Sequence, residues 1–414
     1  MSEQEPPRPG SRVVRRRKVF YVSGYDPRGP LWYHGIYRRE AAKQAELSGM
    51  AIAVSRRDQS SSDIATWTIE AGTGGIETAT EYDFLRWDDI VRGYWPRGLR
   101  LAWLTFAVVA TFIRHGVLGR VLRASWPTFI CGVYPSSFVL GLAFAAILAG
   151  LIIGYTIAWL AGWPGWTGWL IAAAIAIPAT IYGTRVLDRK FSIHWLTRIY
   201  AFNIEQVHRR TPELDGRLDG WAARVANAAQ SGEWDEILVV GHSTGAQAAV
   251  SLLARALKLE PGLGRSGSQI SLLTLGGSIP MLAWWPQAQW VRDELERVAV
   301  QPGLDWIDFT IAQDGACFAL HDPVESSGIA HPPGAEPKPK LLSAKLFDLF
   351  SPETFQAVRR NWYKVHFQYL MAGERLGEYD YFAITAGPLT LADRYSHRAT
   401  TRDFDRFKLK MFGR

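Results

Sequence analysis

The sequence predicts an α/β protein that is interrupted by a transmembrane helical hairpin insertion. Two observations carry this prediction. Short apolar, β-branched segments alternate with segments whose apolar residues follow helical spacing, as in Glu236–Val240 followed by Ala246–Leu257. The stretch from Ala124 to Thr184 contains no Asp, Glu, Lys, Arg or His. A soluble core has no use for an uncharged run of this length, whereas a bilayer span requires one.

The chain before the uncharged run predicts a tail and the first part of the core. Residues 1–17 are basic and contain prolines, and we expect a disordered tail there. Residues 18–94 alternate between strand and helix patterns. The predicted elements are a strand at Lys18–Val22, a helix at Gly35–Leu47, a second core strand at Met50–Val54 and a β-hairpin extension at Thr66–Glu70 and Ile76–Phe84.

Residues 95–190 predict a membrane insertion. Two segments, about 137–163 and 166–182, are apolar and long enough to cross a bilayer, and Pro164-Gly165 predicts a tight turn between them. Four tryptophans near this turn suit a membrane interface, namely Trp159, Trp163, Trp166 and Trp169. Residues 101–113 would form about 20 Å of helix. This is short of a crossing, so we expect a helix in the interface; a third crossing is the alternative.

Basic residues flank the insertion on both sides, while its turn carries no charge. They are Arg114, Arg120 and Arg123 before it and Arg185, Arg189 and Lys190 after it. The positive-inside rule then keeps both outer ends in the cytoplasm. We therefore expect an integral protein of the inner (cytoplasmic) membrane whose other segments, including the main core at 191–414, face the cytoplasm. The polar N-terminus predicts no signal peptide.

Composition restricts the partners. The net charge of +7 would suit nucleic acid or anionic lipid. The basic residues concentrate in Arg12–Lys18 and beside the apolar segments, with no nucleic-acid-binding motif, so we expect the lipid bilayer as partner and no nucleic acid. The run at Arg15–Lys18 is equally consistent with a solvated lead-in to the first strand. Cys131 and Cys317 show no ligand spacing, and we expect neither metal nor cofactor.

The most informative motif is Gly241-His242-Ser243-Thr244-Gly245, which stands between a predicted strand and a predicted helix. Such a turn forces the serine into a strained backbone conformation, and the glycines leave room for it. The hydroxyl is then exposed at a helix N-terminus, where free N–H groups stabilise an oxyanion. An ordinary β–α turn with a capping serine is the alternative.

This motif and its flanks resemble the α/β-hydrolase superfamily, specifically lipases and esterases, in which G-H-S-x-G is common. The resemblance covers residues 18–55 and about 235–370. It implies a mostly parallel sheet with helices on both faces and a Ser–acid–His triad in that chain order. It also implies an oxyanion hole, for which we assign the backbone N–H groups of Tyr25 and Thr244. The turn before Tyr25 begins Ser23-Gly24, where these lipases often have His-Gly.

Chain order then selects the acid. Trp306–Ala312 predicts a strand, and Asp314 follows it at the edge where open α/β sheets place their chemistry. Asp322 is the rival, because it opens the next loop. Asp308 lies inside the strand and is expected to point away.

The base must be a histidine beyond the acid. His366 follows a predicted helix at Pro352–Trp362 and is favoured as a loop-borne base. His397, near the polar C-terminus, is the alternative. His321 lies too close to the acid in sequence, and His331 lies in a Pro/Gly stretch with no element to fix it.

The expected function is a membrane-anchored serine hydrolase, an esterase or lipase that cleaves lipid-like or amphiphilic acyl esters with Ser243, Asp314 and His366. Two other functions stay open. One is a non-catalytic membrane scaffold with a hydrolase-like fold, and the other is an acyltransferase that uses the same nucleophile. The acyl chain, the headgroup and any protein partner leave no readable pattern in the sequence.

Overall fold

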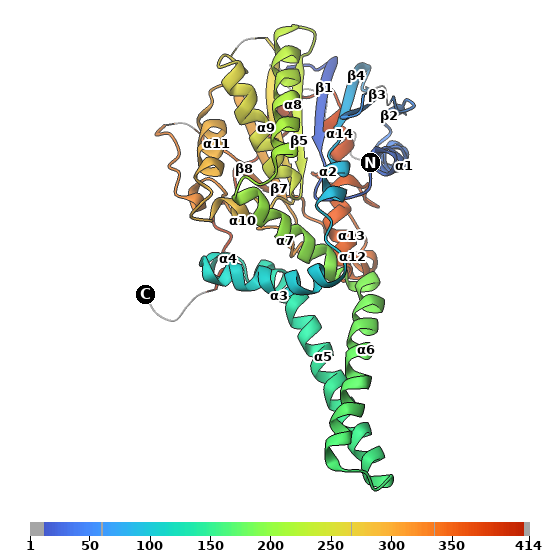
Figure 1. Cartoon of the computed structure of the whole chain (residues 1–414). Helices are drawn as coiled ribbons and strands as arrows, with labels where there is room; N and C mark the ends of the chain where they lie inside the picture. The colour runs from blue at the N-terminus through green and yellow to red at the C-terminus, as the bar shows by residue number, and fades with distance from the viewer. Residues whose placement is uncertain (1–11, 59–60, 266, 335, 410–414) are drawn as a thin grey trace. The chain divides into compact units, whose positions relative to one another are not determined.

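The computed structural model describes residues 12–58, 61–265, 267–334 and 336–409, which fall into two compact units (Figure 1). The first unit contains the described residues up to Tyr94, residues 123–125 and the described residues from Gln206 onward. The second contains Trp95–Leu122 and Trp126–Glu205. The first unit is an α/β domain and the second is entirely helical.

The first unit is built on an eight-stranded sheet in the order β2-β3-β4-β1-β5-β6-β7-β8. Its strands are β1 (Arg16–Val22), β2 (Ala51–Val54), β3 (Ile64–Thr73), β4 (Ile76–Leu85), β5 (Glu236–His242), β6 (Gln269–Leu275), β7 (Leu304–Thr310) and β8 (Lys340–Ser343). From β4 to β8 every neighbouring pair is parallel, whereas β2-β3 and β3-β4 are antiparallel. The predicted α/β class with a mostly parallel sheet is confirmed.

Helices cover both faces of this sheet (Figure 1). On one face lie α8 (Pro212–Gln230), α9 (Gly245–Leu259) and α11 (Gln289–Val300); on the other lie α1 (Pro30–Ser48), α14 (Tyr381–Ala386) and α15 (Leu391–Arg394). Every residue of β5 is buried, because its side chains point alternately into the two layers. This is why the central strands are continuous apolar runs in the sequence.

The remaining helices of the first unit are short and lie in its connections. They are α2 (Asp88–Gly93), α10 (Pro280–Ala283), α12 (Pro352–Val358), α13 (Trp362–Phe367) and the 3-10 turns η1 (Glu325–Ser327) and η2 (Gln368–Leu370). The predicted helix at 352–362 therefore ends early, and His366 lies within α13 rather than in a loop.

Three sequence-based expectations for the first unit are corrected. The predicted second core strand is β2, an edge strand whose alternate residues are exposed. The predicted hairpin extension, β3 and β4, is part of the main sheet because β4 pairs directly with β1. Residues 12–17 of the predicted tail are ordered, with Val14 and Arg17 fully buried; residues 1–11 lie outside the described residues.

The last two residues of the basic run at the start of β1, Arg17 and Lys18, form ion pairs within the fold. Arg17 donates to Glu236 Oε2 at 2.7 Å, and both side chains are 0% exposed. Lys18 pairs with Asp83 at 2.7 Å and also with Glu81. Because the charges of Arg17 and Lys18 are neutralised by carboxylates of the same chain, these two residues do not contribute to attraction to anionic lipid.

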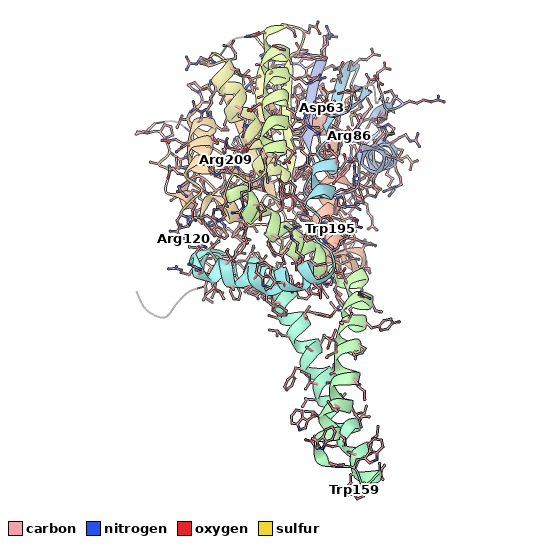
Figure 2. The ribbon with its side chains drawn as sticks, in the orientation of Figure 1. Asp63, Arg86, Arg120, Trp159, Trp195 and Arg209 are labelled. Atoms are coloured by element: carbon pink, nitrogen blue, oxygen red, sulfur yellow. The ribbon has the colours of Figure 1, made fainter. Side chains whose placement is uncertain are left out.

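The second unit contains two helices long and apolar enough to cross a membrane. Its helices are α3 (Gly98–Arg114), α5 (Trp126–Leu160), α6 (Gly165–Phe191) and most of α4 (Val117–Ala124) and α7 (Ile193–Val207), whose last two residues belong to the first unit. The candidate spans are α5 and the part of α6 up to Asp188. α3 and α4 would span only if taken together, and they are bent by 82° at their break. Trp159 lies near the turn of the hairpin and is 80% exposed (Figure 2).

Small residues set the distance between α5 and α6. A Cβ added to Gly150 would lie 2.7 Å from the Ala172 carbonyl oxygen, and one on Gly154 would lie 3.0 Å from the Ala172 nitrogen and closer still to the Gly168 carbonyl. Both glycines therefore allow the two backbones to approach closely. This is the usual basis of helix association in lipid, where apolar side chains alone provide little preference.

Gly154→Leu is expected to lower the stability of the hairpin by about 1–3 kcal/mol, because the added side chain has no space against α6. Gly141→Leu is the matched control on the same helix, since a Cβ there meets nothing within 4 Å. Thermal unfolding of the full chain in one detergent would measure both. Equal midpoints for the two variants would contradict this packing.

Candidate active site

Ser243 lies in the sharp turn that joins β5 to α9. β5 ends at His242 and α9 begins at Gly245, so the reversal is very short. Ser243 has φ +60°, in the left-handed region that residues other than glycine rarely adopt. Its N–H donates to the Leu275 carbonyl of β6, and its own carbonyl accepts from the Ala246 N–H. The strained conformation is thus held between a neighbouring strand and the first turn of a helix.

Three glycines leave the space that this turn requires. A Cβ on Gly241 would lie 2.5 Å from the Gly245 carbonyl oxygen, and one on Gly245 would lie 2.5 Å from the Ser23 carbonyl oxygen. A Cβ on Gly24 would lie 3.3 Å from the Ser243 Oγ. The turn after β1 is therefore packed directly against the serine, and its glycine keeps the hydroxyl accessible.

Asp314 and His366 form a hydrogen-bonded pair. His366 Nδ1 lies 2.9 Å from Asp314 Oδ2, and both residues are buried. Because a carboxylate accepts this bond, Nδ1 carries the proton and a neutral ring has its lone pair on Nε2. Within the described residues, neither His366 Nε2 nor the Ser243 hydroxyl makes a hydrogen bond. The acid–histidine pair that a triad contains is therefore present.

The acid is held by groups that the sequence did not reveal. Tyr369 donates its hydroxyl to Asp314 Oδ2 at 3.2 Å and accepts from the Ile311 N–H at 2.8 Å. The Ala316 N–H donates to Asp314 Oδ1 at 3.0 Å. Gly276, with φ +55°, leaves room for the tyrosine ring, since a Cβ there would lie 2.6 Å from Tyr369 Cε2. A tyrosine three residues after the base carries no recognisable signal in one sequence.

The two rival residues have other partners. Asp322 accepts from His331 Nε2 at 2.9 Å, and His397 pairs with Glu378 at 3.3 Å and is 39% exposed. Asp308, inside β7, accepts from the Thr274 hydroxyl at 2.5 Å, away from His366.

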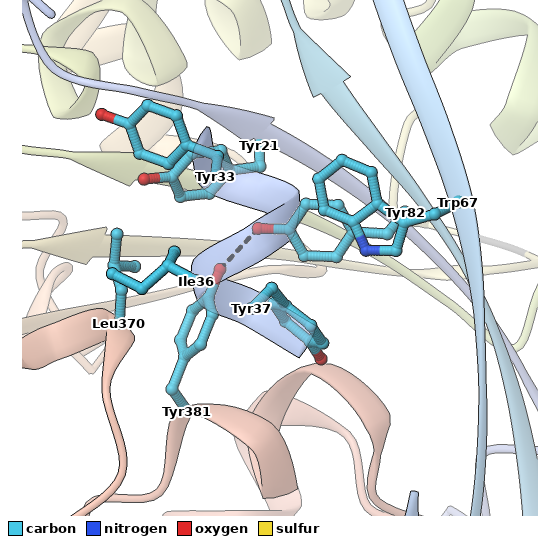
Figure 3. Close-up of a pocket in the computed structure, with 8 residues that line it drawn as sticks. All are labelled: Tyr21, Tyr33, Ile36, Tyr37, Trp67, Tyr82, Leu370 and Tyr381. Atoms are coloured by element: carbon cyan, nitrogen blue, oxygen red, sulfur yellow. Dashed lines mark hydrogen bonds between the residues drawn. The ribbon is translucent and has the colours of Figure 1, made fainter. Parts of the chain in front are cut away.

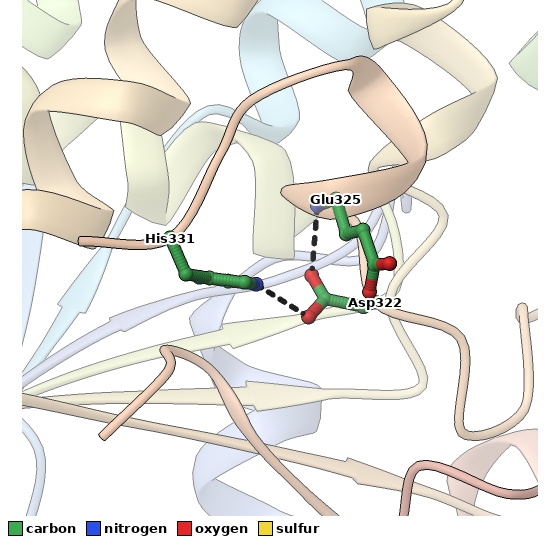
Figure 4. Close-up of side chains that lie close together, drawn as sticks. All are labelled: Asp322, Glu325 and His331. Carbon is green, nitrogen blue, oxygen red and sulfur yellow. Dashed lines mark hydrogen bonds and ion pairs between the residues drawn. The ribbon is translucent and has the colours of Figure 1, made fainter. Parts of the chain in front are cut away.

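Asp322 also belongs to a cluster with Glu325 and His331 whose ligand atoms lie within 4.8 Å of one another (Figure 4). Asp322 Oδ1 accepts from the N–H groups of Val324 and Glu325. The Arg402 guanidinium lies 3.7 Å from both carboxylates. The negative charge of the cluster is therefore offset by Arg402, and Asp322 also caps the turn that follows it.

The assigned oxyanion donors are arranged less simply than expected. The Tyr25 N–H donates to Thr244 Oγ1 at 2.6 Å, so this predicted donor is engaged by the side chain next to the serine. Thr244 itself immediately precedes α9, where the first N–H groups have no partner within the helix. For the Tyr25 N–H to donate to an oxyanion, the Thr244 hydroxyl must rotate away or the N–H must donate to both oxygens at once.

The turn after β1 is anchored by an ion pair between the buried Asp26 and the half-buried Arg28. Arg28 donates to both oxygens of Asp26, at 2.9 and 3.0 Å from Nε, and Tyr33 donates to the same carboxylate at 2.9 Å. The guanidinium stacks 3.7 Å from the Trp32 ring centre and also bonds the hydroxyl of Tyr363. The turn is thus tied to α1 and to α13, the helix that carries His366.

A small aromatic cavity lies in the core on the α1 side of the sheet (Figure 3). It is lined by Tyr21, Tyr33, Ile36, Tyr37, Trp67, Tyr82, Leu370 and Tyr381. The hydroxyls of Tyr82 and Tyr381 lie 2.7 Å apart, whereas that of Tyr21 has no partner in the described part of the chain. Ser243 is not among the lining residues.

Two histidines have strongly lowered pKa values, the buried His242 and the half-buried His321. Burial lowers the pKa of His242 to about 3 and that of His321 to about 4. An unfolded histidine has a pKa of about 6.5, so below that pH the unfolded chain binds protons that the folded chain does not. The stability that depends on these neutral rings is complete above pH 6.5 and is lost as the pH falls toward these values.

His242→Gln and His321→Phe are each expected to gain stability relative to the natural protein as the pH falls from 6.5 to 4, by up to about 1.4 kcal/mol per pH unit. Denaturant unfolding of the full chain at pH 7.5 and pH 5 in one detergent measures the difference. A difference that stays constant between the two pH values would show that these rings are protonated in the fold.

Comparisons of this chain with protein-family models, with curated proteins and with solved structures gave no match in any of the three.

Proposed function

We propose that this chain has an α/β-hydrolase fold and is a membrane-anchored serine hydrolase, an esterase or lipase that cleaves lipid-like or amphiphilic acyl esters. The strongest support is the hydrogen bond that His366 donates to the buried Asp314 at 2.9 Å. Ser243 lies in a positive-φ turn at the start of a helix. His242, which precedes this serine, contacts His366. A serine, a histidine and a carboxylate are the groups that serine hydrolases use to transfer an acyl group to the serine hydroxyl and then to water.

The reaction uses each group for one task. His366 Nε2 accepts the Ser243 proton as Oγ attacks the acyl carbonyl and forms a C–O bond. The Thr244 N–H, with Tyr25 after its release from Thr244 Oγ1, stabilises the oxyanion. The imidazolium, stabilised by Asp314, then protonates the departing alcohol. Water, deprotonated by His366, attacks the acyl-enzyme, and the acid product leaves with Ser243 restored.

The substrate class follows from the anchor. Two helices of membrane-spanning length interrupt the chain between β4 and β5, so both parts of the α/β unit emerge on the same side of the bilayer. Arginines and a lysine flank these helices and favour the cytoplasmic side of the inner membrane. An enzyme confined to this surface meets amphiphilic esters at high local concentration, which favours a lipid-like substrate.

Hydrolysis of a short p-nitrophenyl ester by the full chain in detergent tests the proposal. Ser243→Ala is expected to reduce turnover by roughly 10⁴-fold or more, since no other group replaces the nucleophile. Ser396→Ala, an exposed serine, is the control and should retain full activity. Wild-type activity in Ser243→Ala would end the proposal.

A further inference from the structure

His242 is a buried histidine that the reaction scheme does not use. It is the last residue of β5, next to Ser243, and it is 1% exposed. In the sheet it is paired with Leu275 of β6, so its position is fixed by the central strands. A polar ring buried at such a position is costly unless it makes a specific bond.

That bond is made to the proposed base. His242 Nε2 lies 2.8 Å from the main-chain oxygen of His366, 124 residues away in the chain. The ring also packs against the segment that follows, with ring centres 5.0 Å from His366, 5.4 Å from Phe367 and 5.8 Å from Tyr369. His242 therefore contacts both the base and the tyrosine that holds Asp314.

The protonation of His242 is determined by its surroundings. Its burial disfavours the charged ring, and a carbonyl oxygen can only accept, so Nε2 carries the proton and donates it. Nδ1 then holds a lone pair, and it has no hydrogen-bond partner in the part of the chain that the structure describes. The ring is thus a single-tautomer donor with one polar contact, to His366.

We propose that His242 is a positioning residue, which fixes the main chain of His366 relative to Ser243 through its Nε2–H bond to the His366 carbonyl. This inference rests on the proposed function. Ser243 and His366 come from distant parts of the chain. The bond joins His242, the residue before Ser243, directly to His366. Misplacement of a reacting group by about 1 Å can cost 10²-fold in rate.

The test compares two side chains of similar length. His242→Gln retains an N–H donor that can reach the His366 carbonyl, whereas His242→Met fills similar space without a donor. For a soluble p-nitrophenyl ester, His242→Met is expected to lower kcat about 100-fold with little change in KM, and His242→Gln to stay within about 10-fold of the natural protein. Should His242→Met fail to fold, His242→Asn replaces it, because its shorter amide does not reach the carbonyl.

The structure offers a matched control for loss of a buried bond. His34 is also buried and its Nε2 lies 2.9 Å from a main-chain oxygen, that of Ser55. His34→Met should lower the unfolding midpoint without changing kcat. Wild-type kcat in His242→Met, an equal kcat loss in His34→Met, or no recovery in His242→Gln would each overturn the inference. Ser243→Ala in the same assay separates the proposed function from the proposed role of His242. An inactive Ser243→Ala together with a fully active His242→Met would reject only the role of His242.

Discussion

Replacement of His366 by alanine is expected to lower kcat by roughly 10⁴-fold or more, because the Ser243 proton then has no acceptor. Asp314→Asn should lower it on a similar scale. An amide at that position can donate to Nδ1, which favours the tautomer with its proton on Nε2 and its lone pair on the wrong nitrogen. Because the pair acts as a unit, the loss in the double variant should be far smaller than the product of the two single losses.

The alternative acid and base, Asp322 and His397, provide controls of the same residue types. Asp322→Asn and His397→Gln change residues that the structure pairs with His331 and Glu378, and both variants should retain activity within a few fold. Turnover of a p-nitrophenyl ester and the unfolding midpoint are measured for all variants. Loss of activity in His397→Gln but not in His366→Ala would assign the base to the other histidine.

Glu236→Leu is expected to destabilise the α/β unit by about 3–5 kcal/mol, because it leaves the Arg17 guanidinium buried without a carboxylate. Glu236 Oε2 accepts from Arg17, and Oε1 accepts from the Ser271 hydroxyl and the Leu391 N–H, both at 2.8 Å. One side chain thus joins β1, β5, β6 and the start of α15. Loss of it affects all four elements together.

Denaturant unfolding of the full chain in detergent tests this prediction. The double variant Arg17→Met/Glu236→Leu should recover most of the lost stability, since it removes both charges and leaves apolar groups in their place. Asp89→Leu is the exposed comparison: its pair with Arg217 is on the surface and should contribute no more than about 1 kcal/mol. A loss under 1 kcal/mol in Glu236→Leu would contradict the role given to this pair.

Much of the fold was predictable where structure is local. The turn at 241–245 is determined by its own residues and by the strand and helix beside it, and Ser243 has the strained backbone expected there. The uncharged run likewise predicted two long apolar helices, since a span needs only length and composition.

The errors concern information that lies between distant segments. β2 has the apolar composition of a core strand, but its place at the sheet edge is decided by its pairing with β3. Arg17 and Lys18 read as solvated charge, because nothing local shows that Glu236 and Asp83 will face them. β8 is a short strand that pairs with β7, and its four residues carry no sequence pattern that predicts this pairing.

The site shows the same division. Chain order was enough to favour Asp314 over Asp322 and His366 over His397, and the structure brings Asp314 and His366 together. The supporting residues could not be found in this way. Tyr369 and His242 contact the pair through hydrogen bonds between segments far apart in the chain, and their residue types alone do not distinguish them from ordinary core residues.

The most direct test of the account is the position of a covalent label. The full chain in lipid vesicles is treated with a fluorophosphonate, which phosphonylates an activated serine, and the modified peptide is identified by mass spectrometry. We predict one labelled residue, Ser243, with labelling slowed strongly in His366→Ala. A folded protein that stays unlabelled, or that carries the label on a different serine, would contradict the assignment of Ser243 as a nucleophile.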